Sequence, residues 1–172
     1  MIGFADFEAF LKASFPDMTD GMVERFRLMD AGYRDWNAKI NVISRKDIDS
    51  LYDHHVLHSL AIAEYLRTQR PEVYSMFTAP LQEGSVAPVS SSTNVNASRA
   101  GLRVLDLGTG GGFPGIPLAV MFPNVRFTLC DSVGKKTIVA REIANMLGLD
   151  NVEIVNARAE SLPGRFDFVV SR

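Results

Sequence analysis

A glycine-rich run between two apolar stretches constrains the fold of this chain more than any other feature. The run extends from Gly108 to Gly115, follows the apolar residues of 103–107 and leads into the apolar residues of 115–121. A short strand, a glycine-rich turn and a helix in this order begin a βαβ unit. The alternation continues, because the pattern predicts a helix over 135–147 and strands over 126–130, 152–155 and 166–171. Strands joined through helices pair in parallel, so we expect an α/β fold with a doubly wound parallel sheet.

Composition divides the chain into three zones. Residues 1–79 carry apolar side chains at helical spacing, which predicts an N-terminal helical cap in which Thr19 or Asp20 caps one helix. Residues 80–101 are rich in Ser, Asn, Ala and Pro, which is typical of a flexible linker or surface loop. Residues 102–172 hold the strands and end directly after the fourth one. We therefore expect the sheet to lack C-terminal strands and to leave an apolar edge or face exposed.

Charge and residue content exclude several classes of protein. The formal net charge is −2, from 18 Lys and Arg against 20 Asp and Glu, which argues against indiscriminate binding of nucleic acid. Cys130 is the single cysteine, and His54 and His58 have no accompanying ligands at metal-site spacing, so neither a disulfide nor a metal is expected. We expect no signal peptide and no membrane span, because the N-terminus is not basic and no apolar run approaches about 20 residues. A cytoplasmic location is the expectation.

Acidic residues beside the glycine run indicate what it binds. Gly108, Gly110 and Gly112 can adopt positive φ and let a ligand approach the backbone. Either a dinucleotide or S-adenosylmethionine (SAM) suits such a loop. A carboxylate at Asp106 would repel a pyrophosphate and attract the cationic end of SAM, which favours SAM. Asp131, at the end of the next predicted strand, is placed to bind the ribose of either cofactor, so an NAD(P)-binding oxidoreductase stays open as the alternative.

The end of the third predicted strand adds a further candidate contact. Asn156 is followed by Ala157, Arg158, Ala159 and Glu160. Open α/β sheets bind ligands beyond the carboxyl ends of their strands, so Ala159 and Glu160 are placed to flank an adenine. The alternative is that Arg158 and Glu160 are solvated surface charges.

Several runs of residues match one known protein family. They are Asp106 to Leu118 with its Phe-Pro-Gly-Ile-Pro segment, Leu129 to Lys136, Arg158 to Glu160, Phe166-Asp167, Ser171-Arg172, Trp36 to Asn41, and His55 with Ser59. Together they resemble the GidB (RsmG) family of 16S rRNA guanine-N7 methyltransferases. The resemblance covers nearly the whole chain except the 80–101 zone. It implies a Rossmann-like, SAM-dependent methyltransferase sheet with an N-terminal helical cap.

The resemblance also implies a reaction and a set of contacts. The family substrate is the guanine at position 527, in the 530 loop of 16S rRNA. The N7 atom has a free lone pair, so direct in-line transfer needs no general base and depends on orientation. By resemblance, Asp131 holds the ribose, and Arg172 contacts the cofactor and orients the substrate. The other implied SAM contacts are Gly108, Phe113, Ala159 and Glu160.

Basic residues in both halves are candidate phosphate contacts. They are Lys39, Arg45, Lys46, Lys135, Lys136 and Arg141. The expected partner is 16S rRNA within the small ribosomal subunit, bound by a monomer. A ribosome-binding protein that keeps the fold without catalysis stays open as another alternative.

Overall fold

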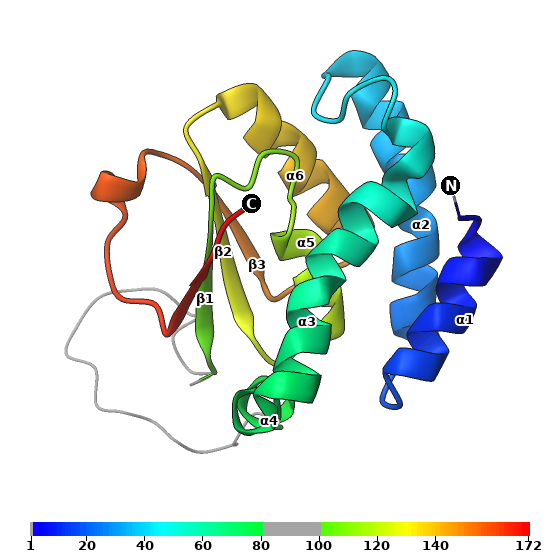
Figure 1. The fold of residues 1–172 in the computed structure, drawn as a ribbon. Helices are drawn as coiled ribbons and strands as arrows, with labels where there is room; N and C mark the ends of the chain where they lie inside the picture. Colours follow the sequence, from blue (N-terminus) through cyan, green and yellow to red (C-terminus); the bar gives the residue numbers. More distant parts are fainter. Residues whose placement is uncertain (1, 81–100) are drawn as a thin grey trace.

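The computed structural model describes residues 2–80 and 101–172 (Figure 1). Almost all of the predicted linker, residues 80–101, therefore lies outside the described residues. The zone boundaries taken from composition stay predictions.

Four parallel strands form one sheet in the order β3-β2-β1-β4. The strands are β1 (Arg103–Leu107), β2 (Arg126–Asp131), β3 (Val152–Asn156) and β4 (Phe168–Val170). The chain moves outward from β1 to β3 and then returns to place β4 on the other side of β1. This reversal confirms the predicted Rossmann-like topology, and it creates a crevice beside the carboxyl end of β1. The fourth strand is shorter than the predicted 166–171.

The helices of the sheet zone cover one face of the sheet (Figure 1). Helix α5 (Gly115–Met121) is buried along its whole length, as its uniformly apolar sequence requires. Helix α6 (Gly134–Met146) buries one side against β2 and β3. The link from β3 to β4 contains only a 3₁₀ turn, Ala159–Ser161. Val169 on β4 is 59% exposed.

The N-terminal zone is helical, as its spacing predicts. It comprises α1 (Phe4–Ser14), α2 (Asp20–Lys39), a 3₁₀ turn (Ile48–Ser50), a π-helical segment (Leu51–Leu57), α3 (His58–Gln69) and α4 (Pro71–Thr78). The Thr19 hydroxyl caps α2, because it accepts a hydrogen bond from the Met22 amide at 3.2 Å. A single hydrophobic core joins these helices to the sheet, including Phe7, Phe26, Leu118 and Phe127.

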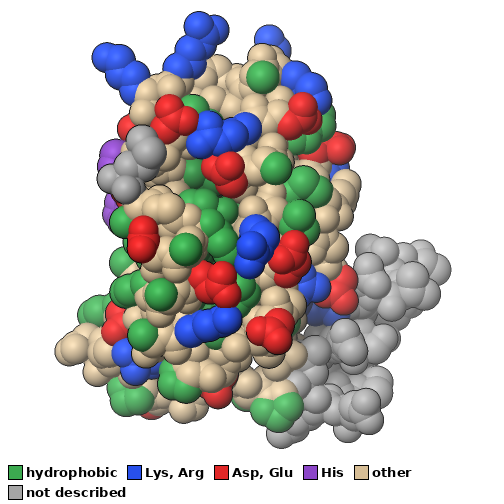
Figure 2. Space-filling view, turned by 90° about the vertical axis from the view of Figure 1, so that its right-hand side faces the viewer, with side chains coloured by type: hydrophobic (Ala, Val, Ile, Leu, Met, Phe, Trp, Pro, Cys, Tyr) green, Lys and Arg blue, Asp and Glu red, His purple; other side chains and the backbone are tan. Residues whose placement is uncertain are grey.

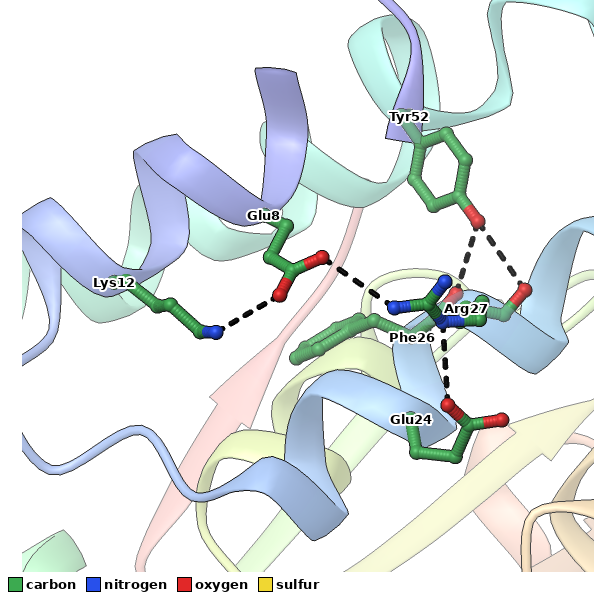
Figure 3. A network of polar contacts seen from close by, with 6 residues as sticks. All are labelled: Glu8, Lys12, Glu24, Phe26, Arg27 and Tyr52. Carbon is green, nitrogen blue, oxygen red and sulfur yellow. Dashed lines mark hydrogen bonds and ion pairs between the residues drawn. The ribbon is translucent and has the colours of Figure 1, made fainter. Parts of the chain in front are cut away.

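A polar network fixes the first helices to one another (Figure 3). The Tyr52 hydroxyl donates to the carbonyl oxygens of Phe26 and Arg27, at 3.1 and 3.3 Å, while its ring stacks on Phe7 at 4.7 Å. Glu8 pairs with Lys12 and Arg27 on the surface. Figure 2 shows acidic and basic side chains interspersed over this face. Such exposed pairs contribute little, so the buried Tyr52 contacts are the stronger link between α2 and the segment that leads into α3.

Candidate functional site

The glycine loop, residues 108–115, leaves backbone open to a ligand on one side. Gly108 and Gly110 have φ of 75° and 58°, and a Cβ atom at either position would meet nothing within 4 Å. Gly112 has φ of 107°, and its Cβ would collide with the Ile116 side chain. The first two glycines thus keep space free in front of the loop, while the third allows the loop to pack against α5.

Asp106 is a fully buried carboxylate behind this loop. Its Oδ2 accepts hydrogen bonds from the Thr109 hydroxyl at 2.6 Å and the Gly115 amide at 2.8 Å. Its Oδ1 has no hydrogen-bond partner among the described residues. Burial raises the pKa of Asp106 to about 6, against the lowering effect of the two hydrogen bonds and of the Arg172 charge. A buried acid with one free oxygen fits a cationic ligand group.

We expect Asp106 to make the folded chain less stable as pH rises from about 4 to about 6. Its pKa is about 6 when folded against an ordinary 3.8, so the folded state binds its proton more tightly. The protonated Asp106 therefore stabilises the folded chain fully at a pH below the pKa that it has in the unfolded chain. This stabilisation is lost as pH rises through the pKa that it has in the folded chain. A difference of about 2 units corresponds to about 3 kcal/mol. Urea unfolding of the parent and of Asp106→Asn between pH 4 and 7 measures the effect.

The asparagine variant keeps an oxygen for Thr109 and Gly115 and carries no charge, so it isolates this group from the other carboxyls. As pH rises, the parent should lose unfolding free energy relative to the variant, because only the parent carries the Asp106 carboxyl. A constant difference across the range contradicts the expectation.

Asp131 anchors the glycine loop to the end of β2. Its buried carboxylate accepts a hydrogen bond from the Gly110 amide at 2.9 Å through Oδ2 and one from the Val133 amide at 2.8 Å through Oδ1. The backbone oxygen of the same residue accepts from the Asn156 side chain at 2.8 Å. Sequence reasoning assigned Asp131 to a ribose and did not anticipate this bond to the loop.

A cavity of about 460 Å³ lies where three strands end. We call it the cofactor cavity; its lining includes Gly108, Cys130, Asp131, Ala157, Ala159 and Glu160. The structure thus brings Gly108, Asp131, Ala159 and Glu160 together from three separate segments. Asp106 lies buried behind the loop, Gly112 and Phe113 are buried residues of the loop itself, and Gly110 joins the set through its bond to Asp131. Cys130 is buried, and its thiol donates to the Ala157 oxygen at 3.2 Å.

Phe113 is held between the helical cap and Arg172. Tyr33 stacks on the Phe113 ring at 4.7 Å and donates its hydroxyl to the Gly111 oxygen at 2.9 Å. The Arg172 guanidinium lies 5.5 Å from the Phe113 ring centroid. It also donates to Nδ1 of His55 at 3.1 Å, because arginine has no acceptor. Burial and the Arg172 charge lower the pKa of His55, which favours the neutral form of the imidazole.

Sequence reasoning missed Tyr33 and His55 in this role. Tyr33 fits a helical apolar pattern, and His55 was noted only within a family motif. Their partners Gly111 and Arg172 are distant along the chain, so spacing alone does not reveal them.

The predicted phosphate contacts lie mainly at the loop end of the sheet. Figure 2 shows several Lys and Arg side chains projecting from the upper end of the molecule, which is the end where α2 stops in Figure 1. Lys39 ends α2 and pairs with Asp35 at 2.7 Å, while Arg45 and Lys46 are exposed in the following loop. Lys135 and Lys136 occupy the first turn of α6. Arg141 lies further along α6 and donates to the Ile154 oxygen at 3.3 Å.

The described residues contain neither a cluster of metal-binding side chains nor a helix that could span a membrane. No group of three or more His, Cys, Asp or Glu in residues 2–80 and 101–172 is arranged to hold a metal ion. Within the same ranges, none of the helices has the length and apolar character needed to cross a membrane.

Comparison with known proteins identifies similar sequences. The sequence model of the family described as GidB, rRNA small subunit methyltransferase G, matches residues 85–172. Proteins named ribosomal RNA small subunit methyltransferase G from Bacteroides fragilis and Porphyromonas gingivalis are each 49% identical over 92% of this chain. The protein of that name from Flavobacterium psychrophilum is 47% identical over 92% of it. The matched regions span 62%, 58% and 61% of these three relatives, so the chain spans about three fifths of their length.

Proposed function

Since this chain belongs to the GidB family, rRNA small subunit methyltransferase G, we propose that it is a SAM-dependent methyltransferase that acts on N7 of a guanine in 16S rRNA. One observation carries the proposal. Asp106 keeps a buried carboxylate oxygen with no hydrogen-bond partner in the described part of the chain, directly behind a loop whose Gly108 and Gly110 leave open space. That combination suits a ligand that has a cationic end and needs close approach to the backbone.

The residues present fit SAM better than a dinucleotide. The second acid, Asp131, lines the cofactor cavity beside Gly108, so two carboxylates flank the loop. Two negative groups favour the ammonium and sulfonium of SAM and disfavour a pyrophosphate. Ala159 and Glu160, which line the same cavity, are the proposed neighbours of the adenine. The NAD(P) alternative keeps only the glycine pattern and Asp131 in its favour.

The proposed chemistry asks the protein to bind and orient. When bound, SAM supplies an electrophilic methyl group. Guanine N7 is unprotonated at neutral pH, so no residue has to remove a proton from it. The residues of this chain contribute by fixing the cofactor loop and the acceptor in position for in-line transfer. Arg172, which reaches Phe113 and influences Asp106, is the proposed orienting residue.

Binding to 16S rRNA in the small subunit is the proposed partnership. A duplex hides N7 in a deep, narrow groove, so the acceptor guanine has to be unpaired or turned outward. Arg45, Lys46, Lys135 and Lys136 are exposed or half-buried cations at the loop end of the sheet and are the proposed phosphate contacts.

Transfer of labelled methyl from SAM to unmodified small ribosomal subunits tests the function. We expect label in 16S rRNA, recovered as 7-methylguanine, and none in subunits that already carry the modification. Calorimetry with SAM and with NAD(P)H separates the cofactor hypotheses. Subunit binding without label would favour the non-catalytic alternative, and binding of NAD(P)H in place of SAM would contradict the proposal.

A further inference from the structure

A second cavity, of about 310 Å³, lies between α3 and the residues that follow β4. One wall is a stripe of α3 at helical spacing, made of His58, Ala61, Ile62 and Tyr65. Pro114 of the glycine loop and Arg172 lie on the opposite side of the lining. Its volume falls at the lower end of the range of about 300–1,000 Å³ typical of small-ligand sites.

The lining combines flat apolar surfaces with a cation. Tyr65 is 55% exposed, although its ring is large and apolar. The Pro114 ring and Ile62 supply further apolar surface, and Arg172 supplies the positive charge. Aromatic rings bind unstacked bases through their faces, and a neighbouring arginine binds either a base plane or a phosphate. An unpaired nucleotide offers these two chemistries in one molecule.

The second cavity lies next to the glycine loop. Pro114 is part of the glycine loop, next to Phe113, and Arg172 stands over the Phe113 ring. The positive charge of Arg172 lowers the pKa of Asp106, so the guanidinium is also near the acid behind the loop. A group in the second cavity therefore lies beside the loop that would hold the methyl donor.

We propose that this second cavity receives the acceptor nucleotide, turned out of the RNA, and that Tyr65 is the platform on which its base stacks. The inference rests on the proposed function and deepens it by assigning the acceptor a place. Arg172 lines this cavity and stands over Phe113, so it contacts the nucleotide from the side of the glycine loop.

Two substitutions at Tyr65 and one matched control test the inference. Tyr65→Ala removes the ring, whereas Tyr65→Phe keeps it. Phe10→Ala removes another exposed aromatic ring, 43% exposed on α1. Because both residues are exposed and lie outside the buried core, these changes should leave the fold intact. SAM affinity, measured by calorimetry, should stay at the parent value in all three.

The readouts are the KM for unmodified small subunits and the fluorescence of a probe. The probe is a single-stranded RNA oligonucleotide that carries 2-aminopurine at the acceptor position, added with the SAM analogue sinefungin. In the parent, Tyr65→Phe and Phe10→Ala, we expect quenching that reports stacking. In Tyr65→Ala we expect the quenching to be lost. We also expect the KM to rise roughly tenfold or more, because one base–aromatic stack is lost.

The outcomes separate this inference from the function beneath it. A parent that neither binds SAM nor transfers methyl contradicts the proposed function. A parent that transfers methyl while Tyr65→Ala keeps the parent KM and quenching overturns the inference alone. A probe whose fluorescence does not change in the parent also overturns it.

Discussion

Gly112→Ala is expected to lower the free energy of unfolding by about 3 to 5 kcal/mol. The φ of 107° at this position lies outside even the left-handed region that other residues occasionally adopt. The added methyl group would also collide with Ile116 and lie 3.2 Å from the Tyr33 hydroxyl. Backbone strain and overpacking therefore act together in a loop buried against α5. Urea unfolding monitored by circular dichroism measures the change.

Gly148→Ala is the matched control for this substitution. Gly148 also has positive φ, 62°, but a Cβ there would meet nothing within 4 Å. Only the backbone cost of about 1 to 2 kcal/mol should appear. Equal losses in the two variants would show that packing at Gly112 is not tight, contrary to the geometry.

Asp131→Ala is expected to weaken SAM binding by at least about 100-fold. The substitution removes two charge-assisted hydrogen bonds, to the Gly110 and Val133 amides, each worth about 1.5 to 3 kcal/mol. Without them the Gly110 and Val133 amides are left unpaired, and only the backbone bonds from Gly108 and Thr109 to the Cys130 oxygen still hold the loop to β2. Calorimetric titration with SAM gives the ratio of dissociation constants.

Two further variants keep this second prediction interpretable. Asp131→Asn has the same shape, but its NH2 group cannot accept a hydrogen bond, so only one of the two backbone amides keeps its partner. This variant should retain the fold and bind SAM roughly tenfold more weakly than the parent. Glu153→Ala removes an exposed acid on β3, outside the cofactor cavity, and should bind as the parent does. If Asp131→Ala bound SAM as tightly as the parent, Asp131 would not be needed to hold the glycine loop for SAM binding.

Local patterns predicted the sheet well because each element is specified by adjacent residues. The predicted strand 103–107 and helix 115–121 agree with β1 and α5 to the residue. The predicted strand 126–130 is one residue shorter than β2, which ends at Asp131. The predicted fourth strand was too long, because pairing with β1 involves only three residues, from Phe168 to Val170.

The support behind the glycine loop was not predictable from the sequence. Tyr33 hydrogen bonds to Gly111 across 78 positions of sequence, and His55 meets Arg172 across 117. The sequence pattern around a tyrosine on the apolar side of a helix is the same whether the ring packs on another helix or on a ligand-binding loop. The bond from Asp131 to the loop was missed because the ribose hypothesis already accounted for an acid at that strand end.

The Tyr33 contact has a consequence for how such chains can be recombined. Val42 packs so closely that a Cβ at Gly111 would lie 2.9 Å from one of its methyl groups, while Tyr33 binds the carbonyl of the same glycine. The N-terminal helices are thus shaped to one glycine of the loop and share a core with the sheet. They are not an exchangeable module. A chimera that takes residues 1–79 from one relative and the sheet from another has to carry Tyr33, Val42 and Gly111 as one inherited set.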